Sequence, residues 1–262
     1  MAENQKPAGE KEKPKTNPVM KFLSTVLKPV DSMFDGLLKM VENAGMTKQI
    51  QYPYYLSQDA FWWGVSQQLF NFEIHGSENV PPEGQAAVFC VNHQSMFDPL
   101  IYGVTVTHYS RRILHIMAKQ ELFDMPGINA YIRWIYAFPV HRGEHDEVAY
   151  QTALDFLKKG ELVGMYPEGT LNGGGLNFLE PKTGAARLAI EAKVPIIPVG
   201  LTGPDKIFPR GATVPNFNAR MIGKIGQPIH IHEKYFGREA THEELKEIMA
   251  HVMDKIRGLL EY

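Results

Sequence analysis

Short apolar runs alternate with amphipathic stretches along most of the chain, which is typical of an α/β protein. Apolar runs bounded by glycine, proline or polar residues predict strands at 86–91, 113–117, 135–138, 162–166, 196–200 and 220–225, with 226–231 extending the last one past a bulge. Apolar residues three and four apart predict helices at 147–159, 182–193 and 241–260, and Pro99 predicts the start of another. These elements predict an α/β fold in layers, with a mixed sheet flanked by helices.

The N-terminal part of the chain has a different pattern. Residues 1–18 are rich in Lys, Glu and Pro and have no apolar run, which predicts a disordered tail rather than a signal peptide. Residues 19–44 predict an amphipathic helix that Pro29 should kink or divide, because apolar side chains recur at helical spacing: Val19, Phe22, Leu23, Val26, Leu27, Val30, Phe34, Leu37, Leu38 and Val41. We therefore expect a tail (1–18), an amphipathic and aromatic helical segment (19–70) and the α/β domain (71–262).

Composition and charge narrow the classes of function. The formal net charge of the 262 residues is −2 and no basic stripe is interleaved with aromatics, so we expect no nucleic-acid partner. Cys90 is the only cysteine, which excludes an intrachain disulfide, and without a cysteine or histidine cluster at ligand spacing we expect no metal. No run reaches the roughly 18 to 20 apolar residues that a spanning helix needs. Membrane contact would be peripheral, through residues 19–70, whose aromatics between 52 and 70 are of the type found at lipid headgroup level.

The strongest candidate for chemistry is the segment Asn92-His93-Gln94-Ser95-Met96-Phe97-Asp98-Pro99. It links a predicted strand to a predicted helix, with Asp98 as the expected helix cap, and such a turn can bring the carboxylate of Asp98 to the imidazole of His93. An imidazole with a pKa near ~6.5 can accept a proton at neutral pH, and a carboxylate on its other nitrogen fixes the tautomer. The alternative is an ordinary loop histidine followed by a helix cap.

Further motifs follow in order: Ala118-Lys119-Gln120-Glu121-Leu122-Phe123, Phe138-Pro139-Val140-His141-Arg142-Gly143, Tyr166-Pro167-Glu168-Gly169-Thr170 and Val194-Pro195-Ile196-Ile197-Pro198-Val199. Together with the Asn-His block they resemble the motifs of the glycerolipid acyltransferase family, most closely its 1-acylglycerol-3-phosphate acyltransferases. The resemblance extends over roughly residues 72–205.

The resemblance implies transfer of a fatty acyl group from acyl-CoA or acyl carrier protein, as co-substrate, to the sn-2 hydroxyl of 1-acylglycerol 3-phosphate, giving phosphatidic acid. No other cofactor is implied. His93 and Asp98 would form the general-base pair, Lys119 and Arg142 would bind the phosphate, and the block Glu168, Gly169 and Thr170 would help to bind the glycerol phosphate moiety. The acceptor is a membrane lipid, so the expected location is peripheral, on the cytoplasmic face of a membrane.

Several alternatives stay open. The family's lysophosphatidate enzymes commonly continue the Glu-Gly-Thr block with Arg-Ser, whereas this chain has Leu171-Asn172, so another lysophospholipid or hydroxyl acceptor is possible. The chain could also be a transacylase or a non-catalytic lipid-surface protein. Lys119 and Arg142 could be ordinary surface charges, Cys90 could be a nucleophile, and residues 19–70 could be core-packed helices. Acyl-chain length, the donor's thiol carrier and the oligomeric state are not encoded in these patterns.

Overall fold

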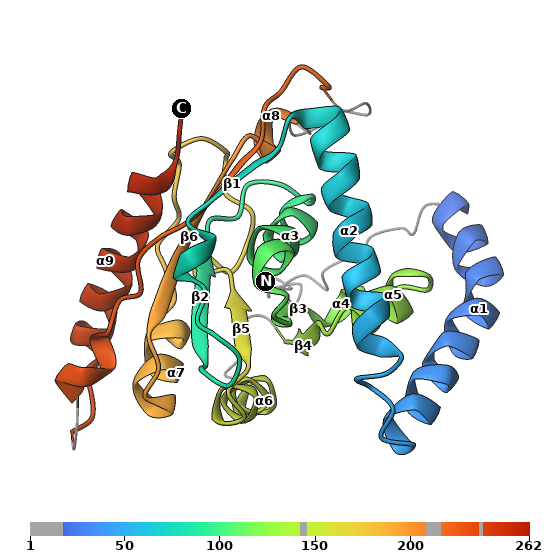
Figure 1. Ribbon diagram of the computed structural model, residues 1–262, viewed down its shortest axis with the longest axis horizontal. Coiled ribbons are helices and arrows are strands. Elements are labelled where there is room, and N and C mark those ends of the chain that lie inside the picture. Colours follow the sequence, from blue (N-terminus) through green and yellow to red (C-terminus); the bar gives the residue numbers. More distant parts are fainter. Residues whose placement is uncertain (1–17, 142–145, 208–215, 236–237) are drawn as a thin grey trace, which may run out of the picture.

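The computed structural model describes residues 18–141, 146–207, 216–235 and 238–262, and the side chains in these ranges except those of 18–27 and 30. The described residues form a seven-stranded sheet in the order β1-β7-β6-β2-β5-β3-β4 (Figure 1). All neighbouring strands are parallel except β6 and β7, so the sheet is mixed, as predicted. The strands are β1 (Glu73–His75), β2 (Ala87–Val91), β3 (Leu114–Lys119), β4 (Phe138–Val140), β5 (Leu162–Met165), β6 (Ile196–Thr202) and β7 (Ile222–Ile225).

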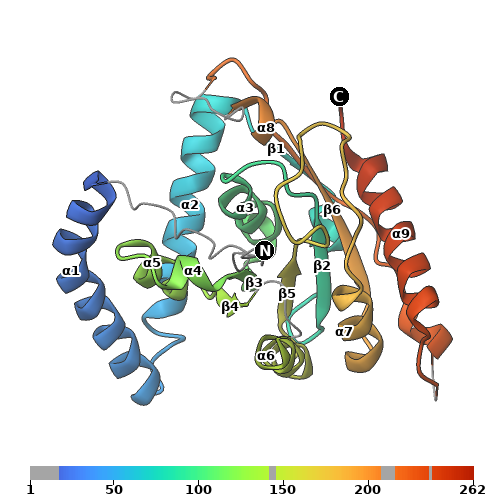
Figure 2. The same cartoon turned by 180° about the vertical axis from the view of Figure 1, so that it is seen from behind.

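Helices cover both faces of the sheet (Figures 1 and 2). Helix α3 (Asp98–Ser110) packs on one face, and α2 (Gln51–Phe70) lies against α3. The opposite face carries α6 (Glu147–Lys158), α7 (Gly184–Ala192) and α9 (His242–Leu259). Strand β2 is buried throughout: Phe89 belongs to the core on the α3 side, and Val88 and Cys90 belong to the core on the α6, α7 and α9 side. A continuous apolar run is what a strand buried on both faces requires.

Most of the strands and helices lie where the sequence predicts them. The exceptions lie where long-range packing decides the conformation. The predicted start of the strand at 135–138 is wrong, since β4 begins only at Phe138. A short helix, α5 (Ile128–Trp134), ends just before residue 135, and Tyr136 adopts a φ of 63°. The expected extension at 226–231 is a single antiparallel bridge between Ile229 and Ile196. The sequence also missed β1 and the short elements α4 (Gln120–Phe123), α8 (Pro204–Ile207), Ser77–Asn79 and Ile231–Tyr235.

Helix α1 (Pro18–Asn43) lies at the opposite end of the molecule from α9 (Figure 1). It continues through Pro29, so the expected division at this proline does not occur. Of the predicted tail, residues 1–17 lie outside the described residues, as do the side chains of the first part of the apolar stripe. None of the helices in the described part of the chain combines the length and apolar character needed to cross a bilayer.

Carboxylates on α1 fasten it to α5. The two carboxylate oxygens of Asp31 accept hydrogen bonds from the backbone amides of Gly127 (2.5 Å) and Ala130 (3.3 Å), at the N-terminal end of α5. These amides lack partners inside α5, so Asp31 caps a helix that is distant from it in sequence. Leu38 and Val41 of the apolar stripe are buried in a cluster with Trp134 of α5. The described part of the stripe is therefore divided, because Phe34 and Leu37 remain exposed.

The aromatic residues of α2 mostly face the domain. Trp63 stacks on His108 of α3 with ring centroids 4.2 Å apart, and the indole N–H of Trp62 donates to the hydroxyl of Tyr131 (2.7 Å). Phe70 is buried in the core beside β2, while Phe61 is 57% exposed. Residues 51–70 thus contribute to the core of the α/β domain, and little aromatic surface is left on this helix for lipid.

The contact between Asp31 and α5 leads to a stability prediction. Asp31→Ala should lower the free energy of unfolding by about 0.5 to 2 kcal/mol, the range for loss of a helix-capping side chain. Chemical denaturation measures this difference. Asp155→Ala, which removes an exposed carboxylate of α6 that has no described side-chain partner, is the matched control and should change stability little. Equal stability of the parent and Asp31→Ala would show that α1 is not docked on α5 in solution.

Candidate active site

Four parallel strands bring the motif residues to one edge of the sheet. His93 and Glu168 lie just beyond the carboxyl ends of β2 and β5, Lys119 ends β3, and His141 follows β4. Because β2, β5, β3 and β4 are parallel neighbours, these ends lie along the same edge. This is where ligands bind in open α/β sheets. The structure therefore brings together motifs that are separated by tens of residues in the sequence.

The predicted pairing of His93 with Asp98 is present. Nδ1 of His93 lies 3.0 Å from Oδ2 of Asp98, and both side chains are buried. The same carboxylate oxygen accepts hydrogen bonds from the backbone amides of Gln94 (2.5 Å) and Ser95 (2.8 Å). The carboxylate holds Nδ1, so Nε2 is the nitrogen left to act on a substrate.

Asp98 is not the cap that the sequence predicts. Helix α3 begins at Asp98 itself, and the residue before it, Phe97, makes no side-chain capping bond. The carboxylate turns back into the preceding loop instead of binding amides of its own helix. Burial raises the pKa of the Asp98 carboxyl, and the hydrogen bonds from His93 and from the Ser95 and Gln94 amides lower it. These bonds therefore offset part of the cost of burying the charge.

Neighbouring amide side chains hold the histidine loop in place. The side chain of Asn92 donates to the carbonyl of Leu201 (2.9 Å) in β6 and accepts from the amide of the same residue (2.8 Å). The side-chain amide of Gln94 donates to the Gly175 carbonyl (2.8 Å) and to the Tyr262 hydroxyl. Sequence reasoning missed the contributions of Gln94 and Tyr262, because they depend on contacts between distant segments.

Glu168 lies behind the loop that carries His93. Its side chain is buried, and Oε1 accepts a hydrogen bond from the backbone amide of His93 (3.0 Å). Oε2 accepts from the backbone amide of Leu179 (2.9 Å), and the side-chain amide of Asn172 donates to both oxygens at 3.0 Å. The carboxylate is therefore occupied by protein donors, and it joins the His93 loop to the chain that follows Glu168.

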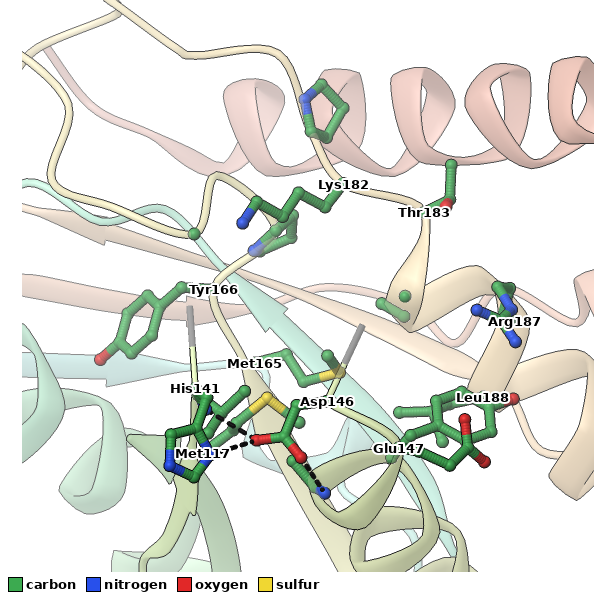
Figure 3. A pocket seen from close by; sticks show the side chains of 18 of the residues that line it. Met117, His141, Asp146, Glu147, Met165, Tyr166, Lys182, Thr183, Arg187 and Leu188 are labelled. Carbon is green, nitrogen blue, oxygen red and sulfur yellow. Dashed lines mark hydrogen bonds and ion pairs between the residues drawn. The ribbon is translucent and has the colours of Figure 1, made fainter. Parts of the chain in front are cut away.

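A cavity of about 540 Å³ lies beside this loop (Figure 3). Tyr166 forms part of its wall, and the ring of Tyr166 stacks on His93 with centroids 4.0 Å apart. Met117, Met165 and Leu188 provide apolar surface. Charged and polar residues line other parts of the cavity: His141, Asp146, Glu147, Glu180, Lys182, Arg187, His242 and Lys246. The cavity thus offers an apolar wall and three cations that can bind an anionic group, next to the carboxylates of Asp146, Glu147 and Glu180.

The remaining predicted residues have different surroundings. Lys119 forms an ion pair with Glu121 (2.9 Å). Gly169 lines the cavity with a φ of 68°, and Thr170 is exposed. Arg142 lies outside the described residues.

His141 precedes Arg142 in the sequence and was given no role there. Its Nδ1 lies 2.9 Å from Oδ2 of Asp146, and its backbone amide donates to the same oxygen at 2.7 Å. Both residues line the cavity (Figure 3).

Two other chemical groups lie away from this cavity. Cys90 is fully buried inside β2. Burial raises the pKa of its thiol, so the thiolate that a nucleophile needs is disfavoured.

A possible group of metal ligands was not expected from the sequence. It consists of His230, His232 and Glu233, whose ligand atoms lie within 4.8 Å of one another. They follow Ile229, which pairs with Ile196 at the amino end of β6, whereas His93 follows the carboxyl end of the parallel strand β2. This cluster is therefore remote from the His93 loop.

Comparison with known proteins identifies relatives by sequence. The family model described as Acyltransferase matches residues 71–202. The chain is 30% identical over 161 residues to the 1-acyl-sn-glycerol-3-phosphate acyltransferase of Bacillus subtilis, an alignment covering 60% of this chain and 73% of that protein. It is also 30% identical over 174 residues to the chloroplastic 1-acyl-sn-glycerol-3-phosphate acyltransferase LPAT1 of Arabidopsis thaliana, covering 64% of this chain and 47% of the plant protein. It thus spans about half of the plant relative.

A solved structure has the same fold. The 1-acyl-sn-glycerophosphate (LPA) acyltransferase PlsC of Thermotoga maritima superposes with a TM-score of 0.61, covering 91% of this chain and 95% of that one. The sequence identity is 22%, so this similarity concerns the fold.

The buried position of Glu168 predicts that its removal destabilises the protein. Glu168→Ala leaves the amides of His93 and Leu179 without their acceptors, and we expect a loss of about 1.5 to 3 kcal/mol in the free energy of unfolding. Thermal and chemical denaturation test this, with Glu180→Ala, an exposed carboxylate on the same segment, as control. A Glu168→Ala protein with unchanged stability and only a raised KM for the acceptor would instead make Glu168 a substrate ligand.

Proposed function

The chain belongs to the glycerolipid acyltransferase family, and from this premise we propose that it acylates the sn-2 hydroxyl of 1-acylglycerol 3-phosphate, giving phosphatidic acid. The donor is an acyl thioester, acyl-CoA or acyl-acyl carrier protein. The relatives named as 1-acyl-sn-glycerol-3-phosphate acyltransferases support this acceptor. The single observation that carries the mechanism is the hydrogen bond between His93 Nδ1 and the buried carboxylate of Asp98.

His93 acts as the general base. Asp98 holds Nδ1, so Nε2 takes the proton of the acceptor hydroxyl while that oxygen attacks the thioester carbonyl. Asp98 then stabilises the imidazolium that forms. Tyr166 stacks on the ring and limits its rotation. The hydrogen bond between His93 and Asp98 supports this division of roles.

The acyl group passes directly from donor to acceptor. A thiolate is a good leaving group, and two substrates held side by side gain much of the rate of an intramolecular reaction. An acyl-enzyme on Cys90 would require a thiol that is buried inside β2 to reach the donor. We therefore propose a single transfer step without a covalent intermediate.

We propose that Arg142 and Lys119 bind the acceptor phosphate. Arg142 follows His141 directly in sequence, and a guanidinium can bind a phosphate with two parallel hydrogen bonds. Lys119, at the end of β3, is a second candidate that would exchange its ion pair with Glu121 for the phosphate. Gly169 and Thr170 lie in the chain that borders the site and are proposed to contact the glycerol moiety. Glu168 supports this segment from behind.

The first prediction of this mechanism concerns the base. His93→Ala should lower the rate of thiol release from an acyl-CoA donor by about 10²- to 10⁴-fold, the contribution of a positioned general base. Asp98→Asn should also lower this rate, because the amide no longer selects the required tautomer of His93. The control is His251→Ala, which removes an exposed histidine of α9 and should leave the rate unchanged.

The products of the same assay separate the other candidate functions. An acyl-thioester enzyme releases one thiol for each acylated product, whereas a transacylase consumes a phospholipid and leaves a lysolipid without releasing thiol. A lipid-binding protein does neither. Thiol release by His93→Ala at the rate of the parent protein would remove His93 from the mechanism.

We also propose that the protein attaches to a membrane surface. We place the protein peripherally on the cytoplasmic face, because its proposed acceptor is a membrane lipid. Helix α1 supports this with the exposed side chains of Met33 (62%) and Met40 (70%) and with the exposed lysines Lys28 and Lys39. Apolar side chains that enter the interface and lysines near anionic headgroups both favour binding.

Replacing the two methionines tests this attachment without removing α1. Met33→Glu/Met40→Glu should reduce co-sedimentation with phosphatidylglycerol vesicles at least about tenfold, since burying each apolar side chain contributes roughly 1.5 to 3 kcal/mol. Activity on a bilayer-borne acceptor should fall more than activity on a short-chain soluble one. Val148→Glu, on an exposed position of α6, is the control. Vesicle binding equal to that of the parent protein would exclude this face of α1 as the docking surface.

A further inference from the structure

Lys182 lies beside the motif Tyr166–Thr170 that follows β5, although twelve positions separate it from Thr170 in sequence. A Cβ atom built on Gly169 would be 2.8 Å from Cε and 3.0 Å from Nζ of Lys182, so the end of the lysine side chain runs along the glycine backbone. The backbone amide of Lys182 donates to the carbonyl of Pro167 (2.9 Å), which fixes the start of the side chain at the same motif. The absence of a side chain at Gly169 makes room for this cation.

The side chain of Lys182 lines the cavity, and no described residue pairs with its amine. In Figure 3 its side chain extends toward the side of the cavity where Tyr166 lies. Among the described residues it makes no side-chain hydrogen bond and no ion pair. Other cations lining the cavity are engaged: Lys246 pairs with Glu243 (3.4 Å), and the guanidinium of Arg187 lies over the ring of Tyr150 (4.9 Å).

The chemistry of the acceptor limits where its phosphate can bind. In 1-acylglycerol 3-phosphate only two carbons and one oxygen lie between the sn-2 hydroxyl oxygen and the phosphorus. A hydroxyl at His93 therefore places the phosphate close to the histidine loop. Tyr166 lines the cavity and its ring stacks on His93, so the cavity begins beside the histidine loop. The chain after Thr170 offers no cation there, since Leu171 is apolar and the amide of Asn172 is bound to Glu168.

We propose that Lys182 binds the phosphate of the acceptor and is a specificity-determining residue of the active site. This inference rests on the proposed function, since it names a group that recognises the anionic end of the same acceptor. The ammonium group donates to the phosphate oxygens as a point charge, and its position over Gly169 preorganises the contact. The acceptor phosphate thereby replaces water around an amine that has no partner in the described protein.

The test compares two substitutions of Lys182 with one substitution of another lysine. Lys182→Met keeps most of the packing over Gly169 and removes the charge, Lys182→Arg keeps the charge, and Lys159→Met removes an exposed lysine at the end of α6 as the matched control. We expect Lys182→Met to raise the KM for 1-acylglycerol 3-phosphate about 10- to 100-fold, with little change in the KM for acyl-CoA. Lys182→Arg should recover much of this loss, and Lys159→Met should match the parent protein.

A binding measurement separates failure of this inference from failure of the proposed function. Glycerol 3-phosphate should bind the parent protein in calorimetry and bind Lys182→Met at least about tenfold more weakly. This result supports the phosphate subsite even if the parent protein acylates a different acceptor. Equal glycerol 3-phosphate affinity and equal acceptor KM in the parent and Lys182→Met would overturn the inference. If Lys182→Met does not fold, Lys182→Gln provides the same comparison.

Discussion

Two buried carboxylates determine the conformation of the histidine loop, and the candidate chemistry depends on them. Asp98 accepts hydrogen bonds from the imidazole of His93 and from two backbone amides. Glu168 accepts a hydrogen bond from the backbone amide of His93. Buried amides and buried charges are each unfavourable alone, but paired in this way they satisfy one another. Asp98 therefore fixes the ring of His93, and Glu168 fixes its backbone.

The order of the strands makes this arrangement possible. β2 lies in the middle of the sheet between β5 and β6, so the loop that follows it meets residues from both neighbours. Glu168 arrives from the end of β5, and Leu201 of β6 binds Asn92. The same strand order places the end of β5, and thus Gly169 with Lys182 over it, beside the loop that carries His93. The fold thus brings Gly169 and Lys182 close to the His93 loop, which no local sequence pattern predicts.

The parts of the site that were predictable from the sequence are those set by neighbours in the chain. The contact between His93 and Asp98 is local, since only four residues of loop separate them, and the apolar run of β2 requires burial on both faces. The burial of Glu168 and the role of Tyr262 depend on segments that meet only after folding. The strand at 135–138 was misplaced for a similar reason: α5 packs on α1 and occupies the residues before β4.

The bond between Asn92 and Leu201 has a consequence for the order of events during synthesis. These residues are separated by 109 positions, and Asn92 is completely buried against β6. A growing chain carries His93 and Asp98 long before the ribosome has added β6. Until then the amide of Asn92 has no strand to bind, and the β2 edge that β6 will cover remains open. The histidine thus reaches its final position late, when most of the α/β domain has already been made.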